Sequence, residues 1–282
     1  MNAPPSLPDP RPFLEAVYDR FHRLEHVEQD PLRFPRRHED PADAEVVALV
    51  AASMAFGRVA SFLRVLETLF DRIGPTPART LARADDQTIA GMAAGLRHRF
   101  VGEAEIAALL RGIRGILQSD GSLKGPFLRG FTPTGDVMDG IDALAGDLRA
   151  HAGVPGPGFL VPVANASGPA KRMNLFLRWM VRHDAIDLGL WPQVTPAALL
   201  VPMDVHVFRA ARFLGLLPPK RSGPTLADAR ALTAALRSMD PDDPVRFDFA
   251  LSHLGISGTC RGRWDPRACP ACALAGACSS GR

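Results

Sequence analysis

Apolar residues recur at intervals of three and four along most of this chain, and this periodicity limits the fold more than any other feature. Such spacing places apolar side chains on one face of a helix. It marks helices over residues 12–26, 43–56, 60–73, 86–97, 103–117 and 137–150. Alternating runs typical of strands are scarce, and many of the 26 Pro and 25 Gly residues mark helix ends. The sequence therefore predicts an all-α protein.

Capping residues mark four helix starts in the second half of the chain. Ser, Asp and Thr are favoured N-caps because their side chains accept hydrogen bonds from free N–H groups of the first turn. We expect Ser167 to start a helix that runs through about Arg182, and Asp204 to start a helix over 205–214 that Gly215 ends. Thr225 and Asp228 have the spacing of a capping box, and Asp243–Pro244 is expected to start a helix towards Gly255.

The chain of 282 residues suits one large domain or two lobes that share a core. We expect a flexible Pro-rich tail over residues 1–12 and a helical domain of two lobes over 13–256. A hairpin is expected near 163–183. The Gly- and Pro-rich stretch 151–170 is interpreted as a connection between the two halves of the chain or as a structured turn. Residues 257–282 then form a separate cysteine-containing loop.

Membrane insertion and secretion find no support in the sequence. No uninterrupted apolar stretch reaches the roughly 18–20 residues that span a bilayer. The first residues, MNAPPSLPDPRP, lack the basic and apolar profile of a signal peptide. We therefore expect a cytoplasmic protein with no membrane partner.

The net charge of +3 is uninformative, but the basic residues are segregated. Two segments contain four basic residues each and no acid: Lys171, Arg172, Arg178 and Arg182 in the first, and Arg209, Arg212, Lys220 and Arg221 in the second. Segregated basic segments suit a polyanion such as nucleic acid. Solvated helix faces explain them equally well.

All four cysteines lie in the last 23 residues, at Cys260, Cys269, Cys272 and Cys278. A secreted disulfide scaffold would distribute them through a small fold, so the pattern C-x8-C-x2-C-x5-C indicates a metal site. Structural zinc more often uses two short Cys-x2-Cys turns, and this chain has one. A [4Fe–4S] cluster tolerates uneven spacing and favours four thiolates. We favour the cluster, with zinc as the alternative.

The end of the chain resembles the end of helix-hairpin-helix DNA glycosylases that carry an iron–sulfur cluster, such as endonuclease III. The resemblance rests on the segment FALSHLGISGTC, residues 249–260, followed by the cysteine loop. The usual first cysteine gap is six residues, whereas here it is eight. The sequence is also similar to an uncharacterised bacterial domain family with the same ending. The resemblance implies a two-lobed helical glycosylase-like fold with a C-terminal iron–sulfur loop.

The segment VPMDVHVFR, residues 201–209, resembles the part of these glycosylases that carries the catalytic aspartate, at the position of Asp204. A carboxylate at a helix N-terminus is stabilised by free N–H groups and the helix dipole. Such a negative charge can stabilise the oxocarbenium-like sugar that forms when an N-glycosidic bond breaks. Asp is also a common N-cap with no further role, and this alternative stays open.

Lys171 begins a helix where the family has its hairpin and, in some members, a nucleophilic lysine. The 33-residue gap to Asp204 is similar to that of archaeal 8-oxoguanine glycosylases. A neutral amine can attack C1′ of the sugar and form a Schiff base, which permits strand cleavage. A lysine exposed to solvent or bound to phosphate is the alternative.

The hairpin would also supply DNA contacts. Backbone N–H groups near Ser167 and Gly168 would bind a phosphate without reading sequence, although the family's usual hairpin contains a second glycine. The other expected contacts are Arg172, Arg178 and Arg209. Trp179, Trp191 and His183 are candidate walls for an extruded base, although a place in the core is the simpler interpretation.

These observations together predict a monomeric DNA-repair glycosylase that excises a damaged base from double-stranded DNA, in the cytoplasm at the nucleoid. Lys171 would be the nucleophile of an added lyase activity, Asp204 the electrostatic stabiliser, and the cluster a structural element. One alternative is a binder of damaged or structured DNA that lacks the chemistry. The other is a helical regulator stabilised by zinc.

Overall fold

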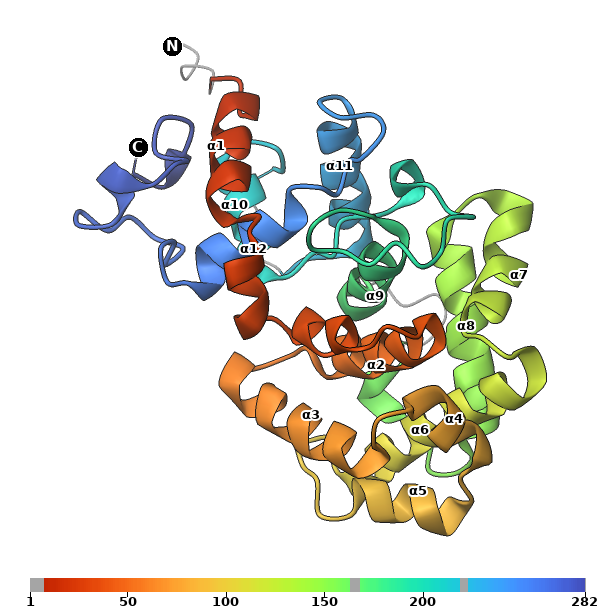
Figure 1. Ribbon diagram of the computed structural model, residues 1–282. Coiled ribbons are helices and arrows are strands. Elements are labelled where there is room, and N and C mark those ends of the chain that lie inside the picture. The colour runs from red at the N-terminus through yellow and green to blue at the C-terminus, as the bar shows by residue number, and fades with distance from the viewer. Residues whose placement is uncertain (1–7, 163–167, 219–222, 282) are drawn as a thin grey trace. The chain divides into compact units, whose positions relative to one another are not determined.

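The computed structural model describes residues 8–162, 168–218 and 223–281. Helices account for the regular structure of these residues, and no strand occurs among them (Figure 1). Isolated bridges join His98 to Val101 and His183 to Leu188. The all-α prediction is therefore confirmed. The chain divides into two compact units that are each discontinuous in sequence.

The first unit comprises the chain up to His26, the segment that ends at Asn174, and the chain from Thr195 onward. Helices α1 and α12 pack closely within it, and α10 packs on α12. Its regular elements are α1 (Arg11–Phe21), the start of α9 (Lys171–Val181), η5 (Pro196–Ala198), α10 (Val205–Phe213), α11 (Leu226–Arg237), α12 (Asp248–Ile256), η6 (Cys269–Ala271) and η7 (Ser279–Gly281).

The second unit comprises residues 27–166 and 175–194. Helix α8 packs closely on both α6 and α7. The regular elements are the end of η1 (Leu24–Gln29), η2 (Pro31–Arg33), η3 (Pro35–Arg37), α2 (Pro41–Met54), α3 (Val59–Ile73), α4 (Pro77–Arg83), α5 (Asp86–Ala93), α6 (Glu103–Asp120), α7 (Lys124–Thr134), α8 (Val137–Ala152), η4 (Gly158–Leu160) and the rest of α9.

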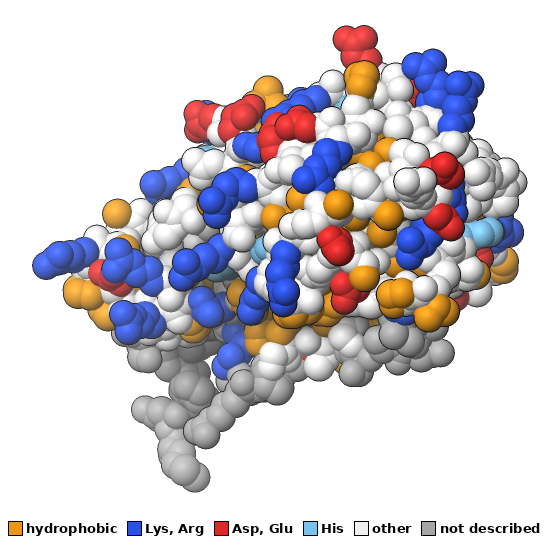
Figure 2. All heavy atoms as spheres, turned by 90° about the horizontal axis from the view of Figure 1, so that it is seen from below, with side chains coloured by type: hydrophobic (Ala, Val, Ile, Leu, Met, Phe, Trp, Pro, Cys, Tyr) orange, Lys and Arg blue, Asp and Glu red, His pale blue; other side chains and the backbone are white. Residues whose placement is uncertain are grey.

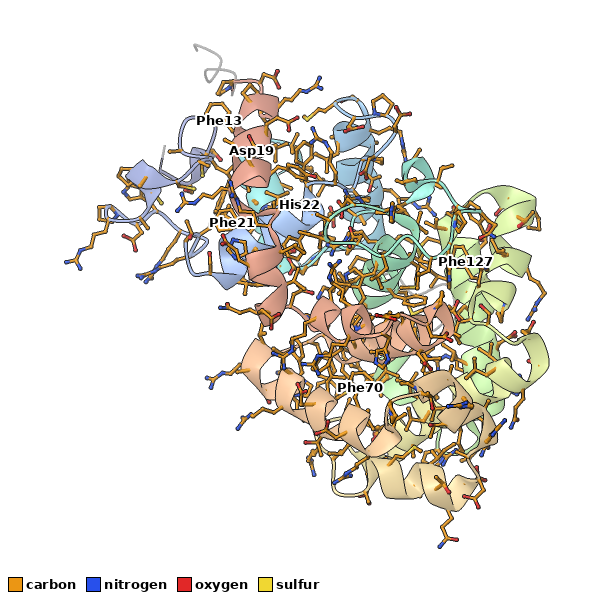
Figure 3. The ribbon with its side chains drawn as sticks, viewed as in Figure 1. Phe13, Asp19, Phe21, His22, Phe70 and Phe127 are labelled. Atoms are coloured by element: carbon orange, nitrogen blue, oxygen red, sulfur yellow. The ribbon has the colours of Figure 1, made fainter. Side chains whose placement is uncertain are left out.

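Helix α2 forms the centre of the second unit. Asp40 caps its N-terminus by accepting a hydrogen bond from Ala42 N–H at 2.8 Å. Every residue from Val46 to Ala52 is fully buried, so the helix is apolar on all sides, as expected for a helix surrounded by protein. Aromatic pairs complete this core, with ring centroids 5.1 Å apart for Phe34 and Phe70 and 5.3 Å apart for Phe127 and Trp191 (Figure 3).

Most predicted helices are present, but several boundaries differ. The helix expected over 12–26 ends at Phe21, and the one expected over 86–97 ends at Ala93. The start at Asp243–Pro244 is wrong, because residues 244–247 form turns and α12 begins at Asp248. The side chain of Arg246 explains this: it pairs with Glu15 and Asp240, which holds the turn against α1. Helices α4 and α7 were not expected.

No helix among the described residues is both long enough and apolar enough to cross a bilayer. The longest of them, α6, has Arg111 and Arg114 within its 18 residues. On the face drawn in Figure 2, Lys and Arg side chains are interspersed with apolar ones.

Glu45 is a buried carboxylate on α2. It accepts hydrogen bonds from Trp191 Nε1–H and Leu123 N–H, each at 2.8 Å, and from the Ser122 hydroxyl. Burial nevertheless raises the pKa of Glu45 above its usual 4.5, because these hydrogen bonds offset only part of the desolvation of the charged form. The carboxylate thus joins the apolar centre of the second unit to two loops.

We expect the Glu45→Gln variant to have a flatter pH dependence of stability than the wild type. A raised pKa means that the folded state binds the proton more tightly than the unfolded state. The free energy of unfolding therefore falls as pH rises from the usual carboxyl pKa through the raised pKa of Glu45. Gln does not titrate, so this decline is absent from the variant, and its altered hydrogen bonds add only a constant offset.

Urea unfolding of both proteins between about pH 4 and about pH 8 measures the difference in slope. Titration of the remaining groups is common to both proteins and cancels in the comparison. Parallel profiles across this range would contradict the prediction.

Candidate functional site

Asp204 is the N-cap of α10. Its Oδ1 atom accepts hydrogen bonds from His206 N–H and Val207 N–H, each at 2.8 Å. None of the described residues donates a hydrogen bond to Oδ2. The side chain is half-buried. The predicted cap is confirmed: one carboxylate oxygen holds the helix start and the other remains available for an electrostatic role.

Lys171 is the first residue of α9 and is half-buried. Ala170, directly before it, has φ +44°, a left-handed conformation that is uncommon outside glycine. The buried Asn174 side chain holds this turn, because its Nδ2–H donates to Pro169 O at 3.1 Å. The lysine thus follows a bent backbone segment, and the hairpin expected near 163–183, which lies partly outside the described residues, stays a prediction. Gly168 is exposed, and Ser167 lies outside the described residues.

Both candidate catalytic residues belong to the first unit, although 33 positions separate them in sequence. The start of α9, up to Asn174, clusters with this unit, whereas the rest of α9 clusters with the second unit. The same unit contains all four cysteines. A single compact body therefore contains the amine, the carboxylate and the four thiols that the sequence singled out.

The four cysteines are half-buried free thiols. Burial raises the pKa of the Cys272 thiol, and the neighbouring thiols of Cys260, Cys278 and Cys269 raise it further, so all four lie within electrostatic reach. Backbone N–H groups donate to two of the sulfurs, from Asp265 to Cys269 Sγ at 3.3 Å and from Leu274 to Cys272.

No group of three or more Cys, His, Asp or Glu side chains among the described residues has the close spacing of bound-metal ligands. The donor set nevertheless fits an iron–sulfur cluster in its chemistry, because it offers four thiols and N–H···S hydrogen bonds, which stabilise negatively charged sulfur.

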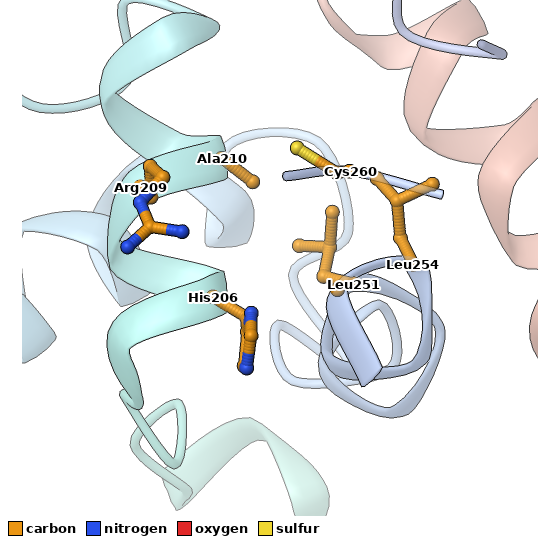
Figure 4. Close-up of a pocket in the computed structure, with 7 residues that line it drawn as sticks. His206, Arg209, Ala210, Leu251, Leu254 and Cys260 are labelled. Atoms are coloured by element: carbon orange, nitrogen blue, oxygen red, sulfur yellow. The ribbon is translucent and has the colours of Figure 1, made fainter. Parts of the chain in front are cut away.

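Close contacts between glycines and side chains of α10 join α10 to α12 and to the cysteine loop. A Cβ atom added at Gly255 of α12 would lie 2.2 Å from His206 Nδ1, and one at Gly262 would lie 2.1 Å from an Arg209 guanidinium nitrogen. Both positions therefore need glycine, and Gly262 also has φ +69°. Helix α10 presents His206 towards α12 (Figure 4), and Arg209 and Cys260 line the same pocket as His206.

A narrow cavity lies between these side chains, lined also by Ala210, Leu251 and Leu254 (Figure 4). Its volume of about 10 Å³ is comparable with that needed for one water molecule. It is too small for a base. Arg209 thus packs on the loop backbone, and a contact between Arg209 and DNA stays a prediction.

Arg178 was expected to contact DNA, but its side chain is 2% exposed. Its Nε atom pairs with Asp187 Oδ1 at 3.2 Å, and Arg182, also buried, pairs with Asp187 and Asp184. The acidic partners, Asp184 and Asp187, lie only a few residues after the basic segment. Because Arg178 and Arg182 are buried with them, much of the basic charge of this segment lies inside the protein. The buried position argues against a contact between Arg178 and DNA.

The remaining residues of this segment divide between core and surface. Burial lowers the pKa of Arg172 to about 10, which leaves the guanidinium charged at neutral pH. Trp179 and Trp191 are fully buried, as the simpler interpretation expected, and His183 is exposed. Arg172 therefore remains a candidate for a DNA contact, and the two tryptophans are part of the buried core.

A family model described as "Protein of unknown function (DUF2400)" matches residues 30–257. No curated protein and no solved structure matches the chain significantly. The family match includes Lys171 and Asp204 and ends before Cys260, so the cysteine loop lies outside it. Because the match covers well over half of the chain, the protein belongs to the DUF2400 family of proteins of unknown function.

Proposed function

We propose that this protein is a DNA-repair glycosylase with lyase activity that excises a damaged base from double-stranded DNA. The observation that carries the proposal is the presence of Lys171, Asp204 and the four cysteines in one compact unit. The turn at Ala170 before Lys171 and the cap at Asp204 support it, because each places a reactive side chain at the start of a helix. The sequence resemblance to helix-hairpin-helix glycosylases supplies the reaction class.

In the proposed reaction, the Nζ atom of Lys171 attacks C1′ of the damaged nucleotide. A bond forms between Nζ and C1′ while the bond from C1′ to the base nitrogen breaks, and the base leaves with that electron pair and takes up a proton. Opening of the sugar ring at O4′ gives a Schiff base. Loss of a C2′ proton then expels the 3′ phosphate and cleaves the strand.

Asp204 acts in this scheme by stabilising positive charge on the sugar. As the base departs, positive charge develops over C1′ and O4′. The Oδ1 atom is held by two N–H groups of α10, so the carboxylate needs little reorganisation to face that charge through Oδ2. The half-buried position of Asp204 limits screening by water.

A lesion panel tests the excision activity. Duplexes that each contain one oxidised, deaminated or alkylated base are incubated with the wild type and with Asp204→Asn. We expect release of at least one base by the wild type and rates about 100- to 1,000-fold lower for the variant, the range seen when one electrostatic stabiliser is removed. Binding of damaged duplex without release of any base would instead support the non-catalytic binder.

We further propose that Cys260, Cys269, Cys272 and Cys278 hold a [4Fe–4S] cluster. When bound, the cluster supplies structural cross-linking rather than a chemical step of base excision. The loop that it orders packs on α10 through Gly262 and Arg209, directly after the helix start that Asp204 caps. Loss of the cluster would therefore weaken the contact between the loop and α10, the helix that Asp204 caps.

Anaerobically purified protein is expected to be brown and to contain about four iron and four sulfide per chain. Cys272→Ala, which removes one of the four half-buried thiols, should lose most of both. Ser252→Ala, which changes a half-buried residue outside the ligand set, should retain them. Colourless wild-type protein with one zinc per chain would contradict the cluster and support the zinc-stabilised alternative.

A further inference from the structure

Three phenylalanine rings contact one another at the surface of the second unit, and we call them the phenylalanine triad. Phe56 follows α2, Phe100 precedes α6, and Phe159 lies in η4. Ring centroids are 5.0 Å apart for Phe56 and Phe159, 5.0 Å for Phe100 and Phe159, and 5.7 Å for Phe56 and Phe100. Phe100 is 56% exposed and Phe159 is 48% exposed. Clustered exposed apolar side chains mark interaction sites.

The triad is built on a rigid base. The buried His98 ring lies 4.4 Å from the Phe56 ring, and its Nε2 atom lies 2.6 Å from Phe56 O, within hydrogen-bond distance. The backbones of His98 and Val101 exchange hydrogen bonds at 2.9 and 3.0 Å, which closes a tight turn that presents Phe100. The rings therefore have little freedom to collapse into the core.

One residue of the same base, Arg99, has a backbone conformation of low intrinsic stability. Arg99 has φ +55°, which is unfavourable for a side chain with a Cβ atom, and Gly57 has φ +78°. A Cβ atom at Gly57 would lie 2.8 Å from Arg99 Cδ, so the arginine side chain lies directly against this glycine. Such conformations persist where the surrounding structure enforces them, and they concentrate at functional sites.

Basic residues flank two members of the triad along the chain, and the Arg99 guanidinium lies 6.0 Å from the Phe100 ring centroid. Arg58, Arg97 and Arg99 are neighbours of the rings in sequence, all are exposed, and none forms an ion pair with a described residue. The nearest acids along the chain, Glu103 and Glu105, accept hydrogen bonds from Gly95 N–H and Gly102 N–H. Those carboxylates hold the start of α6, and the arginines remain available to an anionic partner.

We propose that the phenylalanine triad is a stacking site for unpaired bases of a nucleic-acid strand, with the three arginines binding its phosphates. Flat aromatic faces beside cations suit this partner, since every base has a π-face and every nucleotide a negative charge. The proposal shares with the glycosylase assignment only the nucleic-acid partner and requires no base excision. Phe56 is the inner ring of the site, and Phe100 and Phe159 are the outer rings.

The test measures binding of a fluorescein-labelled single-stranded oligonucleotide and of the fully paired duplex of the same sequence. We expect Phe100→Ala/Phe159→Ala to bind the single strand about tenfold or more weakly than the wild type, with little change for the duplex. Phe100→Leu/Phe159→Leu keeps apolar area without a flat ring and should show a similar loss. Leu24→Ala removes another exposed apolar side chain and should bind as the wild type does.

Three results would overturn the proposal: an unchanged single-strand affinity in the Ala variant, full retention by the Leu variant, or a wild type that binds no single strand. A lipid-binding site is tested by sedimentation with phosphatidylglycerol/phosphatidylcholine vesicles. If the ring substitutions abolish sedimentation with the vesicles but leave oligonucleotide binding unchanged, the site binds lipid instead. Thermal unfolding checks that the variants fold. Covalent trapping on an abasic duplex depends on the Lys171 amine, so it tests the glycosylase assignment separately.

Discussion

Lys171→Ala is expected to lose covalent capture on DNA completely. Borohydride reduces the Schiff base between the wild-type amine and C1′, which leaves an irreversible protein–DNA adduct on an abasic duplex. Alanine has no amine, so neither the adduct nor the coupled strand cleavage can form at this position. We expect adduct yields at the level of adventitious amines, measured by denaturing gel electrophoresis.

Lys124→Ala provides a matched control. Lys124, like Lys171, is the first residue of a helix and is half-buried, but it belongs to the second unit. Its replacement should leave the adduct yield unchanged. Full trapping by Lys171→Ala would show that another amine is the nucleophile, and a wild type that forms no adduct would remove the lyase activity from the proposal.

The largest expected loss of stability follows the replacement of Asp187 by Ala. The Asp187 carboxylate is fully buried and pairs with the buried guanidinium groups of Arg178 and Arg182. Removing it leaves two buried cations without this partner, and breaking a buried pair in this way costs about 3–5 kcal/mol. Much of that cost is the uncompensated burial of the remaining charge.

Urea unfolding measures this loss, with Asp86→Ala as the comparison. Asp86 pairs with Arg114 at 2.8 Å, but its side chain is 73% exposed, and exposed ion pairs contribute at most about 1 kcal/mol. If the two substitutions reduced the free energy of unfolding equally, the interpretation of Asp187 as the centre of a buried ionic network would be wrong.

Local features of the fold were predictable from the sequence. The period of the apolar residues identified most of the long helices, and the caps at Asp204 and Thr225 formed as expected, each with its first-turn N–H partners. Helix α7 escaped detection because Pro133 lies inside it and the apolar period is weak. Capping depends on residues within one turn of each other, which is why it can be recognised from sequence.

The candidate site was predictable only in part. The positions of Lys171 and Asp204 at helix starts follow from local sequence, and their membership of one compact unit does not. The burial of Arg178 was not predictable, because a basic run on a helix does not reveal that Asp187 folds back onto it. The mutual contacts of the phenylalanine triad were not predictable from the sequence, since its members are more than 40 residues apart along the chain.

The amino-acid sequence by itself determined the helical class, most helix starts and the concentration of four thiols near one end, because these depend on near neighbours along the chain. Tertiary structure alone decided which charges became internal, as for Glu45 beside Trp191, and which rings stayed exposed, as for Phe100. The physical reason is desolvation: the free-energy cost of burying a charge or exposing a ring depends on groups that distant segments bring together.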